Sequence, residues 1–268
     1  MILRPIYAVI EREVLRLFRQ RTRLVSAMVR PLSWLFVIGA GFGAVIGHTG
    51  SGDYQQFLAP GILGMTILFG AMLAALTMVY DKESGVMRML IIAPFAHHWI
   101  VVAKTIAAAL AGLIQAALLL MLLAALGFLS SSTHYPLLLL AILVTSVSCA
   151  ALGILVAAFT RTLDNFAAIM NFVIFPVFFL SGALYPVAKL PLALKTTAML
   201  NPFTYCVDLL KHAMLAPPLS GAASELHIGV DLLASAGFTL LAVIIASWRF
   251  SREQVYAPLI RVLAGKRE

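Results

Sequence analysis

The residues best suited to chemistry in this chain gather in one stretch, VYDKESGVMRMLIIAP at 79–94. It carries charges of both signs directly after an uncharged run: Asp81, Lys82, Glu83 and Arg88. A metal and a phosphate in a membrane enzyme would require a larger cluster of acids or histidines. Contact with a partner or with the membrane surface is the chemistry that this stretch favours.

Catalytic arrangements elsewhere are weak. The phosphate-binding sequence G-x-x-x-x-G-K-[ST] does not occur; the glycines from Gly43 to Gly47 are followed by His48 and Thr49 instead. His97 and His98 are adjacent, so on a helix they point roughly 100° apart and make a poor metal pair. We therefore expect that the chain is not an enzyme and that any ATP is hydrolysed on another polypeptide.

The composition predicts a membrane protein. Of 268 residues, 62% are hydrophobic and 11% charged, whereas a soluble domain has about 25% charged residues. The mean hydropathy is +1.00. Charged residues do not fall in the middle of the apolar runs, which argues against a proton or sodium relay.

Apolar runs of about 20 residues predict membrane-spanning helices. Lys104 lies near the start of the third run and is expected to reach the membrane interface. The prediction is an all-α integral membrane protein, a single transmembrane domain over 1–268, with six spans at about 31–48, 60–80, 97–127, 136–159, 166–184 and 230–249.

The distribution of arginine and lysine predicts the orientation. The net charge is +8, and the basic residues concentrate before the first span and in the tail at 250–268. The positive-inside rule then places both termini in the cytoplasm, together with 81–94. Anionic lipid headgroups explain the charge better than a nucleic acid does.

Two segments are expected to lie on the cytoplasmic membrane surface. Residues 4–24 place apolar and basic side chains on separate helical faces, which predicts an amphipathic interface helix. Residues 81–94 predict a second short amphipathic helix, with Asp81 and Glu83 at its N-terminus and its charges facing the cytoplasm. Each segment could serve only as an anchor, or could form a docking surface for a soluble partner.

The segment at 185–229 is long and rich in proline. It contains two apolar stretches too short to cross a bilayer, Leu192–Leu200 and Tyr205–Leu215. Irregular backbone at membrane depth must be packed against protein or water. We expect a re-entrant helical hairpin that caps the outer ends of the spans.

Four sequence segments resemble a known family. FLAPGILGM at 57–65, VYDKESGVMRMLIIAP at 79–94, SGALYPVAKLP at 181–191 and LNPFTYCVDLLKHAML at 200–215 are similar, in this order, to segments of type-2 ABC exporter permeases. That class includes O-antigen, teichoic-acid, nodulation-factor and drug-resistance permeases. The resemblance covers essentially the whole chain.

The resemblance implies a homodimer of six-span subunits with one soluble ATPase docked under each. It assigns 81–94 as a coupling helix beside the N-terminal interface helix. Met89 departs from the family pattern, in which this position is often polar, and this leaves the detailed contact surface open. The expected ATPase-coupling residues are Asp81, Lys82, Glu83, Gly85, Arg88, Arg161, Arg12 and Arg16.

A neutral, aromatic lining is expected for the translocation path. Phe175 and Phe179 share a face of the fifth predicted span, and Asn171 continues it. Ordinary helix packing or lipid contact is the alternative for each ring. The expected path residues are Phe36, Phe69, Asn171, Phe175, Phe178 and Phe179, and the expected outer-cap residues are Pro186, Asn201, Pro202 and Tyr205.

Together these features predict the permease subunit of an ATP-driven exporter in a bacterial cytoplasmic membrane. It would move an amphiphile, such as a drug, lipid or glycolipid, outward. No cofactor is expected on this chain; ATP and Mg²⁺ would bind the partner ATPase. The alternatives are a polysaccharide or teichoic-acid exporter, a membrane enzyme of lipid metabolism, and a membrane scaffold.

Overall fold

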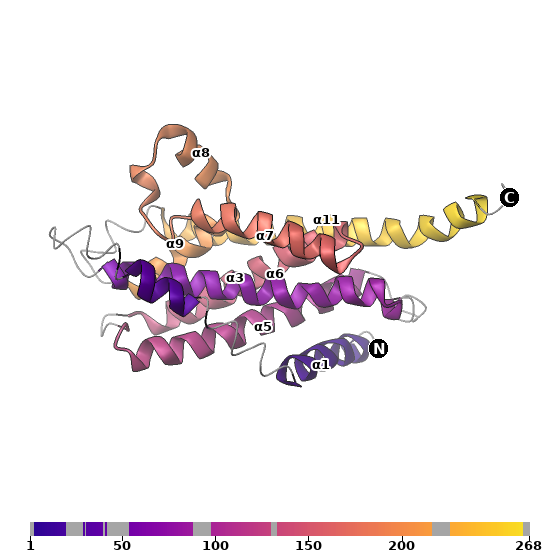
Figure 1. The fold of residues 1–268 in the computed structure, drawn as a ribbon, viewed down its shortest axis with the longest axis horizontal. Coiled ribbons are helices and arrows are strands. Elements are labelled where there is room, and N and C mark those ends of the chain that lie inside the picture. The colour runs from indigo at the N-terminus through magenta and orange to yellow at the C-terminus, as the bar shows by residue number, and fades with distance from the viewer. Residues whose placement is uncertain are drawn as a thin grey trace.

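The chain folds into a bundle of long helices (Figure 1). The computed structural model describes residues 3–19, 29, 31–39, 41, 54–87, 98–129, 133–215 and 226–264. In these residues the regular structure is entirely helical, as the sequence predicted. The helices are α1 (Leu3–Arg19), α3 (Tyr54–Glu83), α5 (His98–Ala125), α6 (Tyr135–Phe159), α7 (Leu163–Phe179), α8 (Leu192–Leu200), α9 (Pro202–Met214) and α11 (Ile228–Ala264), with a 3₁₀ turn η1 (Val187–Lys189).

Four helices are long and apolar enough to cross a membrane: α3, α5, α6 and the Ile228–Arg252 part of α11. They coincide with four of the six predicted spans. The fifth predicted span, 166–184, is shorter in the structure, because α7 ends at Phe179 and turns follow, with Gly182 at a positive φ of 77°. Of the first predicted span, 31–39 and 41 are helical, and the rest lies outside the described residues.

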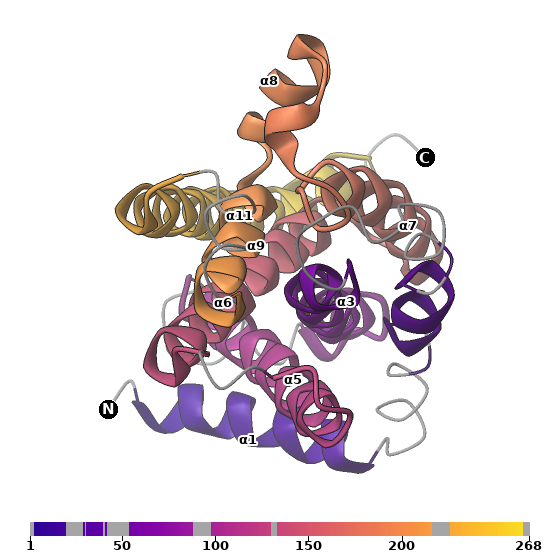
Figure 2. The ribbon, with the colours of Figure 1, turned by 90° about the vertical axis from the view of Figure 1, so that its left-hand side faces the viewer.

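Helix α3 is the centre of the bundle and packs against α5, α6, α7 and α9. It is seen nearly end-on among them in Figure 2. Its side chains are buried all round, including Leu58, Ile62 and Met72. A helix that is hydrophobic on every face belongs in the interior. Helix α11 packs against α6 and α9 and continues as a helix to Ala264, into the segment predicted as the tail at 250–268.

The two short helices of the predicted outer hairpin are present, but they lie in different environments. Helix α9 is packed into the bundle against α6, α11 and α3. Helix α8 stands away from the bundle in both views (Figures 1 and 2), and Leu192 and Leu200 are exposed. The segment is therefore not a uniform cap, since one of its helices belongs to the core.

Helix α1 packs against α5. Figure 2, which looks along the bundle, shows α1 lying across its lower edge, whereas α3 runs towards the viewer. The predicted N-terminal helix is thus present over Leu3–Arg19, and its contact with α5 brings its charged face to the end of the bundle.

Candidate functional site

A cluster of four charged side chains joins α1, α3 and α5. Lys104 Nζ lies 2.5 Å from Asp81 Oδ2 and 2.6 Å from Glu13 Oε1. Arg12 Nη2 lies 2.5 Å from Asp81 Oδ2 and 2.8 Å from Glu13 Oε1. We call Arg12, Glu13, Asp81 and Lys104 the charge cluster. Two cations and two anions meet in it, so its formal charge is balanced.

The cluster is buried, which corrects two predictions. The side chain of Asp81 is 2% exposed and that of Lys104 is 1% exposed. Asp81 is therefore a buried charge and not a solvent-facing one, and Lys104 is buried within the protein instead of extending to an exposed position. Buried charges are retained where they are paired and hydrogen-bonded, and each of these two residues supplies a partner for the other.

Glu13 was not singled out from the sequence. It is one of two acids, with Glu11, on a helix that also carries several arginines, whereas Lys104 is one cation in a long apolar run. Burial alone would raise the pKa of Glu13, but the positive charges of Lys104 and then Arg12 outweigh it and hold the pKa below its ordinary value. The opposite charges of Glu13 and Lys104 were the signal in the sequence from which their pairing could have been predicted.

The two residues after Asp81 bind two further helices. Lys82 Nζ donates to the carbonyl oxygens of Ala157 and Ala158, at 2.9 and 3.2 Å, at the C-terminal end of α6. Glu83 Oε2 accepts a hydrogen bond of 3.0 Å from the backbone N–H of Leu163, the first residue of α7. The cation thus meets the negative end of one helix dipole, and the anion meets the positive end of another.

The expected coupling helix begins differently from the prediction. Asp81 and Glu83 lie in the last turn of α3, not in the first turn of a new helix. Gly85 follows at φ +78°, the left-handed conformation that ends a helix and that favours glycine. Val86 and Met87 are helical, whereas Arg88 and the rest of 81–94 lie outside the described residues.

The other expected coupling residues lie at the same end of α3. Arg16 Nη1 is 4.0 Å from Asp81 Oδ1, and its guanidinium lies 4.6 Å from the centre of the Tyr80 ring. Arg161 is exposed in the turn between α6 and α7. Glu83 is exposed as well, so it can be reached by a partner while it contacts α7.

The expected path residues separate into exposed and buried groups. On α7, Phe175 and Phe179 are 46% and 36% exposed, and Asn171 is exposed. Phe36 is 49% exposed on the helical segment at 31–39. Phe69 and Phe178, in contrast, are 5% and 1% exposed. The last two belong to the core of the single chain, which corrects their assignment to a path between two chains.

Aromatic contacts join the segment at 31–39 to the end of α7. The Trp34 ring lies 5.9 Å from that of Phe178 and 5.7 Å from that of Phe179, both edge to face. Phe175 stacks on Phe179 at 6.3 Å. These geometries are the favoured ones for aromatic pairs, and they leave one side of Phe175 and Phe179 accessible.

The expected cap residues hold the turn between α8 and α9. Asn201 Oδ1 accepts from the backbone N–H of Phe203 at 3.1 Å and caps α9, while its Nδ2 donates to the carbonyl oxygen of Val177 at 2.7 Å. Pro202 occupies the first turn of α9, where proline is favoured. Tyr205 Oη donates to the carbonyl oxygen of Met199 at 2.7 Å. Pro186 precedes the turn η1.

The four sequence segments form two groups at the two ends of α3. At the Tyr54 end, 57–65, 181–191 and 200–215 pack together: Lys211 Nζ donates to the carbonyl oxygen of Gly182 at 2.7 Å and lies 4.8 Å from the centre of the Phe57 ring. Segment 79–94 begins at the Glu83 end, beside the charge cluster. The 30 residues of α3 separate these ends by about 45 Å.

Comparison with known proteins identifies the class. Residues 4–215 match the family described as ABC-2 type transporter, and the chain belongs to this family. It is 29% identical over 212 residues to nodulation protein J of Rhizobium leguminosarum bv. viciae, covering 77% of this chain and 80% of that protein. It is 26% identical over 214 residues to the putative transport permease ycf38 of Cyanophora paradoxa, covering 77% and 72%.

Family membership and the apolar helices define the chain as a multi-pass membrane permease of an ABC transporter. It is the membrane subunit and not itself the ATPase, and the family implies an ABC ATPase as its partner. The resemblance stated from the sequence is thereby confirmed.

Proposed function

We propose that the chain is the permease of an exporter that moves an amphiphilic molecule, a drug, lipid or small glycolipid, outward across a bacterial cytoplasmic membrane. Two copies of the chain would form the path, and two ATPase subunits would bind ATP and Mg²⁺. Six spans would place both termini on the cytoplasmic side. Family membership favours transport over a membrane enzyme or a scaffold. Substrate class and outward direction rest on the resemblance.

The observation that carries the proposal is the set of contacts made by Asp81, Lys82 and Glu83. Asp81 contacts side chains of α1 and α5, Lys82 binds the end of α6, and Glu83 binds the start of α7. A force applied to the segment that follows Glu83 would therefore reach five helices at once, α3 included. Such a junction suits a subunit that must convert the motion of a soluble motor into a change of its membrane helices.

The orientation is supported by the charges at this end of the bundle. Described arginines gather here from three elements: α1, the α6–α7 turn and α11. They are Arg12, Arg16, Arg161, Arg249 and Arg252, and Arg249 lies 5.5 Å from the centre of the Phe159 ring. An excess of lysine and arginine is typical of the cytoplasmic side. The Glu83 end would then be the side on which an ATPase docks.

The test is co-purification from the native membrane in a mild detergent, followed by mass spectrometry. We expect a stoichiometric soluble protein that carries a G-x-x-x-x-G-K-[ST] sequence, and we expect it to be lost in Glu83→Lys, which still inserts into the membrane. Lys189→Glu, an exposed charge reversal on η1 at the other end, is the matched control. A chain that repeatedly purifies alone and stimulates no ATPase on reconstitution would refute the proposal.

A further inference from the structure

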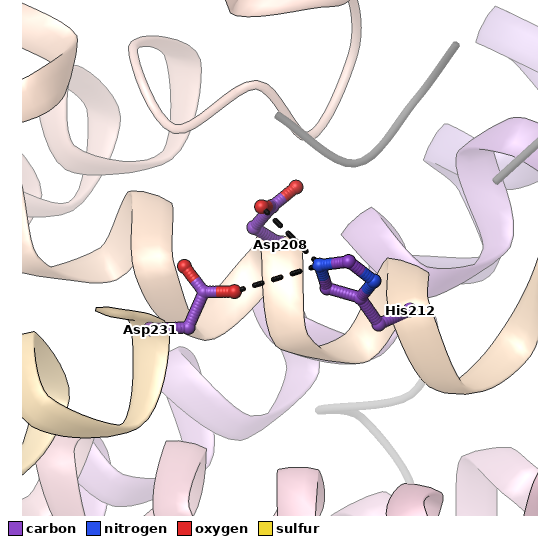
Figure 3. A group of neighbouring side chains, drawn as sticks. All are labelled: Asp208, His212 and Asp231. Atoms are coloured by element: carbon purple, nitrogen blue, oxygen red, sulfur yellow. Dashed lines mark ion pairs between the residues drawn. The ribbon is translucent and has the colours of Figure 1, made fainter. Parts of the chain in front are cut away.

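A second group of ionisable side chains lies near the Tyr54 end of α3, far from the charge cluster. Asp208 and His212 are one turn apart on α9, so they share a face of that helix. Asp231 comes from the first turn of α11. Figure 3 shows the three side chains converging, with the imidazole of His212 directed at both carboxylates.

The ligand atoms of this group lie close enough together that they could hold a metal ion. His212 Nε2 lies 3.8 Å from Asp208 Oδ2 and 3.7 Å from Asp231 Oδ2, and one ligand atom of each residue lies within 4.8 Å of the others. The same nitrogen is hydrogen-bonded to the carbonyl oxygen of Leu226 at 2.8 Å, and Asp208 Oδ2 accepts a hydrogen bond of 3.0 Å from the backbone N–H of Leu226. Binding of an ion would replace the contact between the nitrogen and the carbonyl oxygen. Ligands at zinc distances in a tetrahedron are about 3.4 Å apart, so small side-chain shifts would enclose an ion.

Asp231 supplies the independent reason to expect a ligand. It is 0% exposed, and neither of its carboxylate oxygens has a hydrogen-bond partner among the described residues. A buried carboxylate without a hydrogen bond is costly, and a second acid beside it increases the cost. With a neutral histidine, the three side chains would hold two negative charges, which a divalent cation between them would offset.

We propose that Asp208, His212 and Asp231, with the carbonyl oxygen of Leu226, bind a divalent transition-metal cation of the Zn²⁺ type. One nitrogen ligand among oxygen ligands suits such an ion better than Mg²⁺, which prefers oxygen alone. The ion fastens α9 to the start of α11 and so fixes both ends of the connection between these helices. The site does not depend on the proposed transport function.

The test uses the full-length chain purified in detergent, stripped with a chelator, and titrated with Zn²⁺ in equilibrium dialysis with elemental analysis. We expect one tightly bound Zn²⁺ per chain, and an affinity lowered by about 100-fold or more in Asp231→Asn and in His212→Ala. His134→Ala and Asp164→Asn, exposed residues outside the group, are the controls and should bind as the wild type does. Zn²⁺ should raise the unfolding temperature of the wild type but not that of Asp231→Asn.

Three results would overturn the proposal: no stoichiometric Zn²⁺ on the wild type, equal binding by the wild type and both ligand variants, or a preference for Mg²⁺ over Zn²⁺. The first two would show that the group binds no Zn²⁺ through these side chains, and the third would make it a site for a cation that prefers oxygen ligands. Asp231→Asn nearly preserves shape, so a folded variant is expected, and a cooperative unfolding transition checks this. If Asp231→Asn does not fold, Asp208→Asn takes its place in the test, and the same loss of Zn²⁺ affinity is expected.

Discussion

Lys104 Nζ at the start of α5 and Asp81 Oδ2 at the end of α3 lie 2.5 Å apart in a place that water scarcely reaches. The sequence separates these residues by 23 positions, and Glu13 and Arg12 of α1 close the arrangement from a third helix. The charge cluster therefore fixes α1 to the bundle at the Glu83 end of α3.

Removing Lys104 should destabilise the chain strongly. Lys104→Met leaves Glu13 and Asp81 buried, with the half-exposed Arg12 and the more distant Arg16 as the remaining cations. Breaking a buried ion pair in this way costs about 3–5 kcal/mol. Thermal unfolding in detergent measures the loss, with Lys189→Met as an exposed control. Adding Asp81→Asn and Glu13→Gln should restore part of the stability. A loss below about 1 kcal/mol, typical of surface pairs, would contradict this account.

Acid should release α1 through Glu13. The pKa of Glu13 is lowered from 4.5 in the folded chain, so its contribution to stability is complete above pH 4.5 and is lost as the pH falls through the lower folded value. Unfolding temperatures measured from pH 6 down to about pH 3 should fall more steeply for the wild type than for Glu13→Gln. Glu11→Gln, exposed on the same helix, should follow the wild type. If the unfolding temperatures of the wild type, Glu13→Gln and Glu11→Gln fall in parallel with pH, Glu13 does not contribute to the pH dependence of stability.

Gly61 should not tolerate a side chain. A Cβ atom at this position of α3 would lie 2.5 Å from the carbonyl oxygen of Ala183, so Gly61→Ala must push apart α3 and the segment that follows α7. Overpacking of this kind costs about 1–3 kcal/mol. Gly237→Ala in α11, where a Cβ would meet nothing within 4 Å, should be neutral or stabilising by up to about 1 kcal/mol. Equal unfolding temperatures for the two variants would disprove the close approach.

The exposed rings of α7 should matter for transport and not for assembly. Replacing Phe175 and Phe179 together by Ala removes the stacked pair beside Trp34, and we expect changed substrate transport or increased leak in proteoliposomes with the ATPase still bound. Leu139→Ala on α6, an exposed apolar residue, is the control. Wild-type transport in the double variant would show that both rings serve only in packing or lipid contact.

The sequence predicts the long helices well because their lengths and hydropathy follow from the solvent that surrounds them. Four of the predicted spans correspond to α3, α5, α6 and α11. For the majority of the helix ends, the predicted and observed bounds differ by only a few residues. The pairing of buried charges was not predictable in this way. Lys104 was assigned to the interface on the assumption that a lone cation needs water, whereas its partners, Glu13 and Asp81, come from other helices.

The segment after α7 shows a second limit of the sequence. The prolines correctly indicate two short helices, and the Asn201–Pro202 pair marks the turn between them. They do not indicate that α9 enters the bundle while α8 stands outside. That difference depends on close contacts, such as Gly64 of α3 facing Phe203 and Val207 of α9, and no local pattern encodes them.

The charge cluster also has a bearing on the order in which the chain is made. Arg12 and Glu13 leave the ribosome first, Asp81 follows, and Lys104 comes last, at the start of the next long helix. Until Lys104 arrives, the three earlier residues carry one net negative charge at the end of α3. The insertion of α5 brings the missing positive charge, so this step completes the neutralisation and closes the assembly of the first helices. A biosynthetic intermediate that ends before Lys104 should therefore hold α1 loosely, and the full-length chain should hold it firmly.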